Sequence, residues 1–211
     1  MKHLLSIEKM NVADMREILQ SSAKVKADRG RHEEAPLDGQ TWAMIFSKSS
    51  TRTRVSFEVG IREWGGNAIF MGARDMQLGR GEPIKDTARV LGRMTHGAII
   101  RTFAQQDVED FAEYSGIPTI NALTDFGHPC QILTDIFTFE EKLGSIEGKV
   151  VTFVGDGACN VSTSWIFAAA KLGFELRIAA PRKYQPGVEL LQRAGGNVVC
   201  TEDVNAAAEG S

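Results

Sequence analysis

Six consecutive residues, Ser49-Ser50-Thr51-Arg52-Thr53-Arg54, lie between an apolar run and a helix-like segment. The preceding run, 42–46, is continuously apolar, which predicts a buried strand. The following segment, 55–64, carries apolar residues among polar ones at spacings typical of an amphipathic helix. A buried strand, a short polar turn and a helix in this order indicate an α/β fold, with the turn placed at a helix N-terminus.

The turn combines hydroxyls and guanidiniums where a helix begins. Unpaired backbone N–H groups and the positive end of the helix dipole both favour an anion at such a position. Arginine adds a planar fork that matches phosphate or carboxylate oxygens. The alternative is an ordinary Ser/Thr helix cap with solvated arginines. Because Arg52 and Arg54 would repel each other unless an anion lay between them, we favour an anion site. The sequence has no NTPase-type loop ending in Gly-Lys-Ser/Thr.

Strand-like and helix-like segments alternate along the rest of the chain, which implies parallel sheets with right-handed crossovers. The expected strands are 68–71, 98–100, 119–121, 150–154, 176–179 and 198–200, and the expected helices include 84–94, 107–114, 129–143 and 188–194. We therefore predict an α/β protein of two domains, 1–144 and 145–211, each with a parallel β-sheet flanked by helices and separated at the glycine-rich break 144–148. Three strands make a small sheet, so we expect the second domain to be incomplete in this chain, with poorly covered apolar faces around Val151, Phe153 and Ile178.

Composition narrows the classes of function. The chain is 43% hydrophobic and 24% charged, which is typical of a soluble globular protein. A net charge of -3 argues against nucleic-acid binding, and no apolar run approaches the ~18 residues that would suggest a membrane span. The N-terminus lacks the features of a secretion signal, so we predict a cytoplasmic protein. The three cysteines, Cys130, Cys159 and Cys200, are not in a metal-ligand spacing.

Further polar groups follow the expected strands, and ligands of open parallel sheets lie beyond the carboxyl ends of strands. Arg101 comes directly after 98–100, and His128-Pro129-Cys130-Gln131 opens the helix after 119–121, with Pro129 suited to a first helical position. A surface charge and a helix-cap residue are the plainer interpretations of Arg101 and His128. Together with Arg52, however, an imidazole and an amide could polarise a carbonyl group and stabilise an oxyanion.

The turn Gly155-Asp156-Gly157-Ala158-Cys159-Asn160 follows the strongest strand and superficially resembles a dinucleotide-binding turn. The third glycine of that pattern is missing, and Ala179-Ala180-Pro181 stands where an acidic residue is expected. Arg182 lies nearby, so an NADP-dependent oxidoreductase stays a distant alternative.

A family resemblance joins these motifs. The stretch Phe46-Ser47-Lys48-Ser49-Ser50-Thr51-Arg52-Thr53-Arg54-Val55-Ser56-Phe57-Glu58 resembles the carbamoyl-phosphate loop of the aspartate and ornithine carbamoyltransferases. Arg101-Thr102 and His128-Pro129-Cys130-Gln131 are shared with that family, and the segment from Gln77 to Glu82 is similar to the loop that reaches into a neighbouring subunit in its ornithine-specific members. Gln77 and Asn160 favour ornithine over aspartate, whereas Cys159 stands where the family more often has a second Asn. The resemblance covers essentially the whole chain.

The resemblance implies transfer of a carbamoyl group from carbamoyl phosphate to L-ornithine, giving L-citrulline and phosphate without a metal or an organic cofactor. Catalysis would fall to Arg52, Arg101, His128 and Gln131. The expected carbamoyl-phosphate ligands are Ser50, Thr51, Arg52, Thr53, Gln77, Arg101, His128, Pro129, Cys130 and Gln131. Asn160 would contact ornithine, and Gln77 would act across a subunit interface in a homotrimer or a multiple of trimers.

Two further alternatives concern the end of the chain. The family's remaining motifs for the amino-acid substrate would lie beyond Ser211, so the acceptor could also be putrescine or an acylated ornithine. For the same reason we expect residues 1–211 to bind carbamoyl phosphate without making citrulline. If the 211 residues are the whole protein, a non-catalytic binding module is the other possibility.

Overall fold

The computed structural model describes residues 2–31, 33–72 and 81–211. The chain forms two compact units, of which the first comprises Met1–Leu5 and Ser21–Asp125 and the second Ser6–Gln20 and Phe126–Ser211. The elements in chain order are α1 (Val12–Ala27), β1 (Thr41–Phe46), α2 (Arg52–Glu63), β2 (Asn67–Gly72), α3 (Ile84–Met94), β3 (Gly97–Arg101), α4 (Gln105–Ser115), β4 (Thr119–Leu123), α5 (Pro129–Leu143), β5 (Val150–Val154), α6 (Asn160–Leu172), β6 (Glu175–Ala179), η2 (Arg182–Tyr184), α7 (Val188–Ala194), β7 (Val198–Thr201) and α8 (Val204–Ala208).

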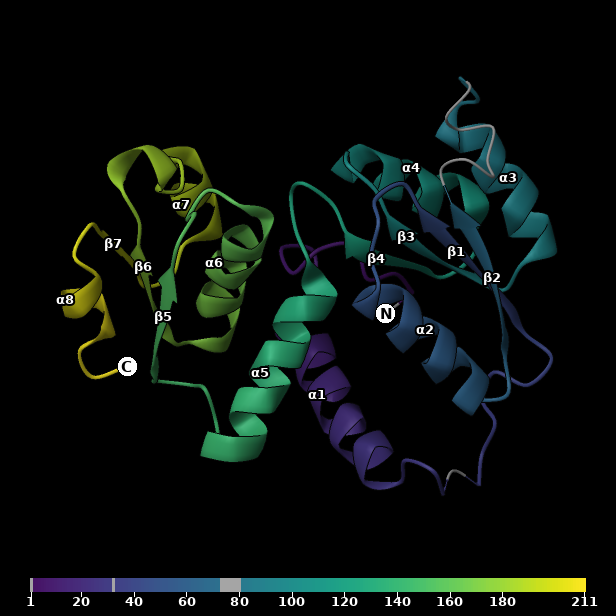
Figure 1. Ribbon diagram of the computed structural model, residues 1–211, viewed down its shortest axis with the longest axis horizontal. Coiled ribbons are helices and arrows are strands. Elements are labelled where there is room, and N and C mark those ends of the chain that lie inside the picture. Colours follow the sequence, from purple (N-terminus) through teal and green to yellow (C-terminus); the bar gives the residue numbers. More distant parts are fainter. Residues whose placement is uncertain (1, 32, 73–80) are drawn as a thin grey trace. The chain divides into compact units, whose positions relative to one another are not determined.

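The first unit is built on a four-stranded parallel sheet in the order β2-β1-β3-β4. Strand β1 is buried on both faces, because Ala43 and Ile45 belong to one apolar cluster and Met44 and Phe46 to another. The first cluster includes residues of α3 and α4, the second includes Ile61 of α2, and Figure 1 shows these helices on opposite faces of the sheet. This double burial explains why the strand reads as one continuous apolar run.

The second unit contains a three-stranded parallel sheet in the order β5-β6-β7. Helix α6 supplies much of its core through Ile166, Phe167 and Leu172, which are almost fully buried. Helix α8 is tied to β5, because the Thr152 hydroxyl donates a 2.7 Å hydrogen bond to the carbonyl oxygen of Ala207. Helix α5 is linked to α1 by an ion pair of 2.7 Å between Arg16 Nη1 and Glu140 Oε1.

The predicted α/β class with parallel, helix-flanked sheets is confirmed. The bounds expected for 84–94, 129–143, 150–154 and 188–194 coincide with α3, α5, β5 and α7. Helix α2 also forms, but its apolar stripe is narrower than the spacing suggested, since Val55 is 54% exposed and only Ile61 is buried.

The expectation that Ile178 would be poorly covered is wrong, because its side chain is fully buried. A Cβ atom on Gly157 would lie 2.7 Å from Ile178 Cγ2 and 3.0 Å from the carbonyl oxygen of Tyr184. The turn after β5 therefore packs directly on Ile178, and the absence of a side chain at Gly157 makes this contact possible. In β5 the exposed apolar residue is Val154, at the carboxyl end of the strand.

Among the described residues, no helix combines the length and apolar character needed to cross a lipid bilayer.

Candidate active site

The turn between β1 and α2 brings hydroxyl and cationic side chains to the carboxyl edge of the first sheet. The Ser50 hydroxyl accepts a 3.2 Å hydrogen bond from the backbone N–H of Thr53, as an N-capping side chain does. Thr51 holds the N-cap position of α2, and its side chain makes no capping hydrogen bond. The capping role weighed in the sequence is therefore real for Ser50. Arg52 and Thr53 are the first residues of the helix, where backbone N–H groups and the dipole favour an anion.

The two arginines of the turn behave differently. Arg54 stacks on Phe70, with its guanidinium carbon 3.7 Å from the ring centroid, and its Nε lies 3.8 Å from Glu58 Oε2. Arg52 is exposed and makes no hydrogen bond or ion pair with any other residue in the described part of the chain. The structure thus gives Arg54 partners other than an anion, so a shared anion is not needed to offset its charge. Of the two arginines, Arg52 is the one whose guanidinium has no partner among the described residues.

Arg101 ends β3 next to this turn. Its register partner is Phe46, and its carbonyl oxygen accepts a 2.8 Å hydrogen bond from the backbone N–H of Ser47. Nε of Arg101 is buried and lacks a hydrogen-bond partner within 2–31, 33–72 and 81–211. Burial also lowers the pKa of this guanidinium from its ordinary value, although an arginine stays charged at neutral pH. A buried donor without a partner is costly, so Arg101 is suited to an anionic or carbonyl ligand.

The segment 128–131 lies in the second unit at the start of α5. His128 is the N-cap residue and Pro129 the first helical residue, as predicted. The backbone N–H of His128 donates a 2.9 Å hydrogen bond to the Ser164 hydroxyl, which itself donates to the carbonyl oxygen of Asn160 at 3.0 Å. Ser164 is a buried residue of α6. The structure thus joins the predicted His128 and Asn160 segments through a residue that sequence reasoning missed.

Gln131 and Cys130 differ in what they can offer a ligand. Nε2 of Gln131 donates a 2.7 Å hydrogen bond to Oδ1 of Asp135, and burial raises the pKa of that carboxyl group. Burial raises the pKa of the Cys130 thiol to about 12, so the thiol is protonated at neutral pH. A protonated thiol is a poor nucleophile, which makes Cys130 unsuitable for covalent catalysis.

The turn that precedes Asn160 offers little to an anion. Asp156 accepts a 3.0 Å hydrogen bond from the backbone N–H of Ala158 through its own carboxylate, which places a negative charge inside the turn. The packing of Gly157 on Ile178 accounts for that glycine without a pyrophosphate. These contacts remove the main reason for considering a dinucleotide here. Asn160 is the first residue of α6.

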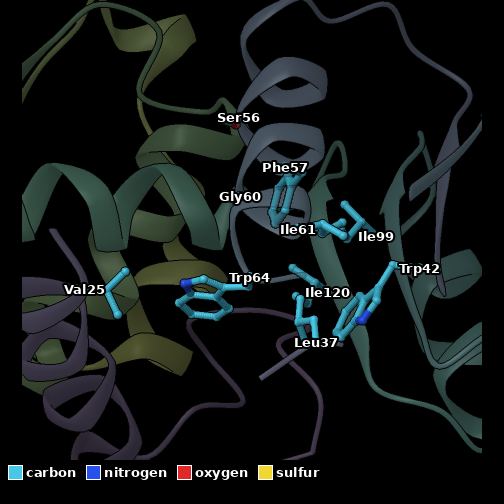
Figure 2. Close-up of a pocket in the computed structure, with 10 residues that line it drawn as sticks. All are labelled: Val25, Leu37, Trp42, Ser56, Phe57, Gly60, Ile61, Trp64, Ile99 and Ile120. Carbon is cyan, nitrogen blue, oxygen red and sulfur yellow. The ribbon is translucent and has the colours of Figure 1, made fainter. Parts of the chain in front are cut away.

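A separate cavity of about 270 Å³ lies in the first unit beside α2. Figure 2 shows Trp42, Phe57, Trp64, Ile99 and Ile120 around it. Its walls are almost entirely aromatic and aliphatic, so it cannot compensate the charge of a phosphate. The predicted anion site and this cavity are therefore different places.

The predicted site residues thus fall into two groups. Ser50, Thr51, Arg52, Thr53 and Arg101 belong to the first unit, and His128, Pro129, Cys130, Gln131 and Asn160 to the second. Gln77 lies outside the described residues. Each group lies where polar side chains follow parallel strands and helices begin.

Comparison with known proteins identifies the family of the chain. Residues 2–141 match the family described as aspartate/ornithine carbamoyltransferase, carbamoyl-P binding domain, and residues 147–211 match the Asp/Orn binding domain of the same family. An ornithine carbamoyltransferase from Akkermansia muciniphila is 57% identical over 100% of this chain and 70% of its own length. One from Halorhodospira halophila is 46% identical, with the same coverage.

Solved structures show the same relationship. The ornithine carbamoyltransferase from Burkholderia thailandensis superposes with a TM-score of 0.94 and 43% identity, over 100% of this chain and 73% of that one. The enzyme from Pyrococcus furiosus gives a TM-score of 0.92 and 41% identity, over 98% of this chain and 68% of that one. Sequence and structure agree over essentially all 211 residues. The chain belongs to the aspartate/ornithine carbamoyltransferase family.

Proposed function

We propose that this chain belongs to an ornithine carbamoyltransferase, which transfers the carbamoyl group of carbamoyl phosphate to the side-chain amine of L-ornithine and gives L-citrulline and phosphate. The observation that carries the proposal is a pair of guanidiniums at one edge of the first sheet: among the described residues Arg52 has no hydrogen-bond or ion-pair partner, and Nε of Arg101 is buried without one. They occur in a carbamoyltransferase chain that is 57% identical to a relative named for ornithine. No observation favours putrescine, an acylated ornithine or a dinucleotide as the ligand.

The turn between β1 and α2 would hold the phosphate. In this proposal Arg52 binds phosphate oxygens, and Ser50, Thr51 and Thr53 contribute hydroxyl or backbone donors. Arg–phosphate hydrogen bonds are charge-assisted and roughly twice as strong as neutral ones. The Ser50 hydroxyl can still donate its proton to a phosphate oxygen while it accepts from Thr53.

The carbamoyl end would be bound by Arg101, His128 and Gln131, with Pro129 and Cys130 in the same turn. The ornithine amine adds to the carbonyl carbon, and the resulting tetrahedral intermediate carries an oxyanion. The bond between this carbon and the phosphate oxygen then breaks, phosphate leaves with the electron pair, and the former amine loses a proton. Stabilisation of the oxyanion and positioning of both substrates would supply most of the rate enhancement.

The remaining assignments follow from the family. Asn160 would contact ornithine, and Gln77 would complete the site of a neighbouring subunit in a homotrimer or a multiple of trimers. We also propose that 1–144 forms the carbamoyl-phosphate domain and 145–211 the beginning of the ornithine domain. The compact units change at Asp125 and Phe126, whereas the two family matches change between residues 141 and 147. A role in arginine biosynthesis in the cytoplasm is the expected context.

An acceptor panel tests the reaction. The protein is incubated with carbamoyl phosphate labelled in its carbonyl group and with ornithine, N-acetylornithine, putrescine or aspartate in separate reactions. From a protein that carries the whole amino-acid site we expect labelled citrulline with ornithine and no labelled product with the other three, whereas residues 1–211 alone should bind carbamoyl phosphate without forming citrulline. Preferential carbamoylation of another acceptor would refute the substrate assignment. Binding of carbamoyl phosphate measured in parallel would show whether the phosphate site exists when an acceptor gives no product.

A further inference from the structure

Lys48 lies in the turn between β1 and α2, two residues before Ser50, and its ammonium group is already committed. Nζ forms an ion pair with Oδ1 of Asp125 and lies 4.4 Å from the centroid of the Phe103 ring. The Lys48 side chain is 20% exposed, whereas that of Asp125 is 66% exposed. A cation held between a carboxylate and an aromatic face is fixed in direction. Lys48 therefore differs from Arg52, whose guanidinium is free among the described residues.

The backbone connects the three turns that Lys48, Phe103 and Asp125 occupy. The N–H of Ser47 donates to the carbonyl oxygen of Arg101 at 2.8 Å, and the N–H of Asp125 donates to that of Phe103 at 2.8 Å. These turns follow β1, β3 and β4, so they lie at the same carboxyl edge of the sheet. The side chain of Lys48 thus bridges from the first turn to the third, and the turn with Arg101 lies between them.

Asp125 also marks where the chain leaves the first unit. It is the last residue of that unit, and His128 follows three residues later in the sequence. The ion pair with Lys48 holds this last residue of the first unit against the turn after β1. The same pair fixes the turn that carries the phosphate ligands.

We propose that Lys48 and Asp125 are positioning residues for carbamoyl phosphate and that neither contacts the substrate. This inference rests on the proposed function. Lys48 orders the turn at 47–51, so that the N-terminus of α2 and Arg52 face the phosphate. It also neutralises Asp125, whose carboxylate would otherwise repel an anion at this edge of the sheet.

Lys48 and Asp125 carry opposite charges, so they have opposite effects on a nearby anion. This difference allows an experiment to distinguish a positioning role from simple structural support. Removing the Lys48 charge loosens the turn and leaves the Asp125 carboxylate uncompensated, and both changes weaken phosphate binding. Removing the Asp125 charge loosens the turn but frees a cation, so the two effects oppose each other. Replacing both residues removes the repulsion together with the attraction. The double variant should therefore bind an anion better than the variant that lacks only the lysine.

Calorimetric titration of the protein with a phosphonate analogue of carbamoyl phosphate provides the test. The variants are Lys48→Met, Lys48→Arg, Asp125→Asn and the double variant Lys48→Met/Asp125→Asn. Lys142→Met is the control, because Lys142 is 70% exposed and its ion-pair partner is Glu141. Arg52→Ala is titrated in parallel, and thermal unfolding is recorded for every variant.

We expect Lys48→Met to weaken binding by about tenfold and the double variant to recover about threefold of that loss, as coupled charges in contact are not additive. Lys48→Arg should bind within about threefold of the parent, because it keeps the cation above Phe103. The control should bind like the parent.

Binding by Lys48→Met that matches the parent, while Arg52→Ala binds weakly, would overturn this inference and leave the proposed function intact. Equal losses for the single and double variants would also overturn it, because they would show that the Asp125 charge has no effect. Unweakened binding by Arg52→Ala would instead refute the phosphate site itself. A lower unfolding temperature for Lys48→Met, without recovery of binding in the double variant, would show that the pair only supports the fold.

Discussion

The turn after β1 and the turn after β5 have the same local architecture but different chemistry. Each follows the first strand of its own sheet and begins a long helix, α2 or α6. In the first turn Arg52 lies at a helix N-terminus and makes no hydrogen bond or ion pair with a described residue. In the second, Asp156 occupies the turn with a carboxylate, and Gly157 packs against Ile178. A strand-turn-helix unit is therefore not an anion site by geometry alone. The cationic side chain of Arg52 at the helix N-terminus, unpaired among the described residues, is what distinguishes the first turn.

Loss of the Arg52 guanidinium should have the largest effect. Arg52→Ala should weaken carbamoyl phosphate binding by roughly 10- to 150-fold, because a charge-assisted hydrogen bond contributes about 1.5–3 kcal/mol. Calorimetric titration measures this change in affinity. The matched control is Arg62→Ala on the same helix, since Arg62 is 66% exposed and pairs with Glu58. Equal affinity of the two variants would remove the distinction between the turns.

A substitution in the turn after β5 should lower the stability of the protein. Gly157→Ala places a methyl group 2.7 Å from Ile178 Cγ2 and 3.0 Å from the carbonyl oxygen of Tyr184. We expect the free energy of unfolding to fall by about 1–3 kcal/mol, the usual cost of overpacking. Gly60→Ala is the control, because a Cβ there meets nothing within 4 Å and the residue lies within α2. It should be neutral or stabilising by up to about 1 kcal/mol. Denaturant titration measures the free energy of unfolding of both variants. An unchanged value for Gly157→Ala would contradict the packing argument.

The first turn of α5 contains a buried thiol, that of Cys130. Because the pKa of Cys130 is raised to about 12, native Cys130 should react with iodoacetamide at least about tenfold more slowly than in the unfolded chain at mildly alkaline pH. The same shift makes the folded state lose stability, relative to neutral pH, as the pH rises from the ordinary thiol value of 9.0 toward about 12. Peptide mass spectrometry measures the labelling rate. Equal rates in the folded and unfolded chain would contradict the burial of the thiol.

The smallest effect is expected at Arg54, the second arginine of the first turn. Arg54→Met keeps an apolar contact with Phe70 but loses the cation. Because Arg54 pairs with Glu58 and its side chain is 46% exposed, we expect carbamoyl phosphate affinity to fall by no more than about threefold, as for screened surface charges. A loss as large as that of Arg52→Ala would show that both arginines bind the phosphate.

The fold could largely be predicted because the signals that define it are local. Strand β1 reads as a continuous apolar run since both of its faces are buried, and Pro129 marks the start of α5. The resemblance in the turn after β1 also led to the family that the comparisons show. Each of these inferences depends on neighbouring residues or on a contiguous motif.

The pairing of side chains could not be predicted, since it depends on residues distant in sequence. Arg54 stacks on Phe70, and Lys48 pairs with a residue 77 positions away. Ser164, which receives the His128 N–H, lies 36 positions further along the chain. The coverage of Ile178 likewise depends on the approach of Gly157. A cation at a strand end looks the same in sequence whether it is paired or free.

Titration of the isotopically labelled protein with a phosphonate analogue of carbamoyl phosphate, followed by amide NMR, tests the central claim most directly. It reports on the turns after β1 and β5 in one experiment. The largest shifts are predicted for the amides of Ser50, Thr51, Arg52 and Thr53, with a smaller response at 155–160. Largest shifts at 155–160, with the turn after β1 unperturbed, would contradict the account.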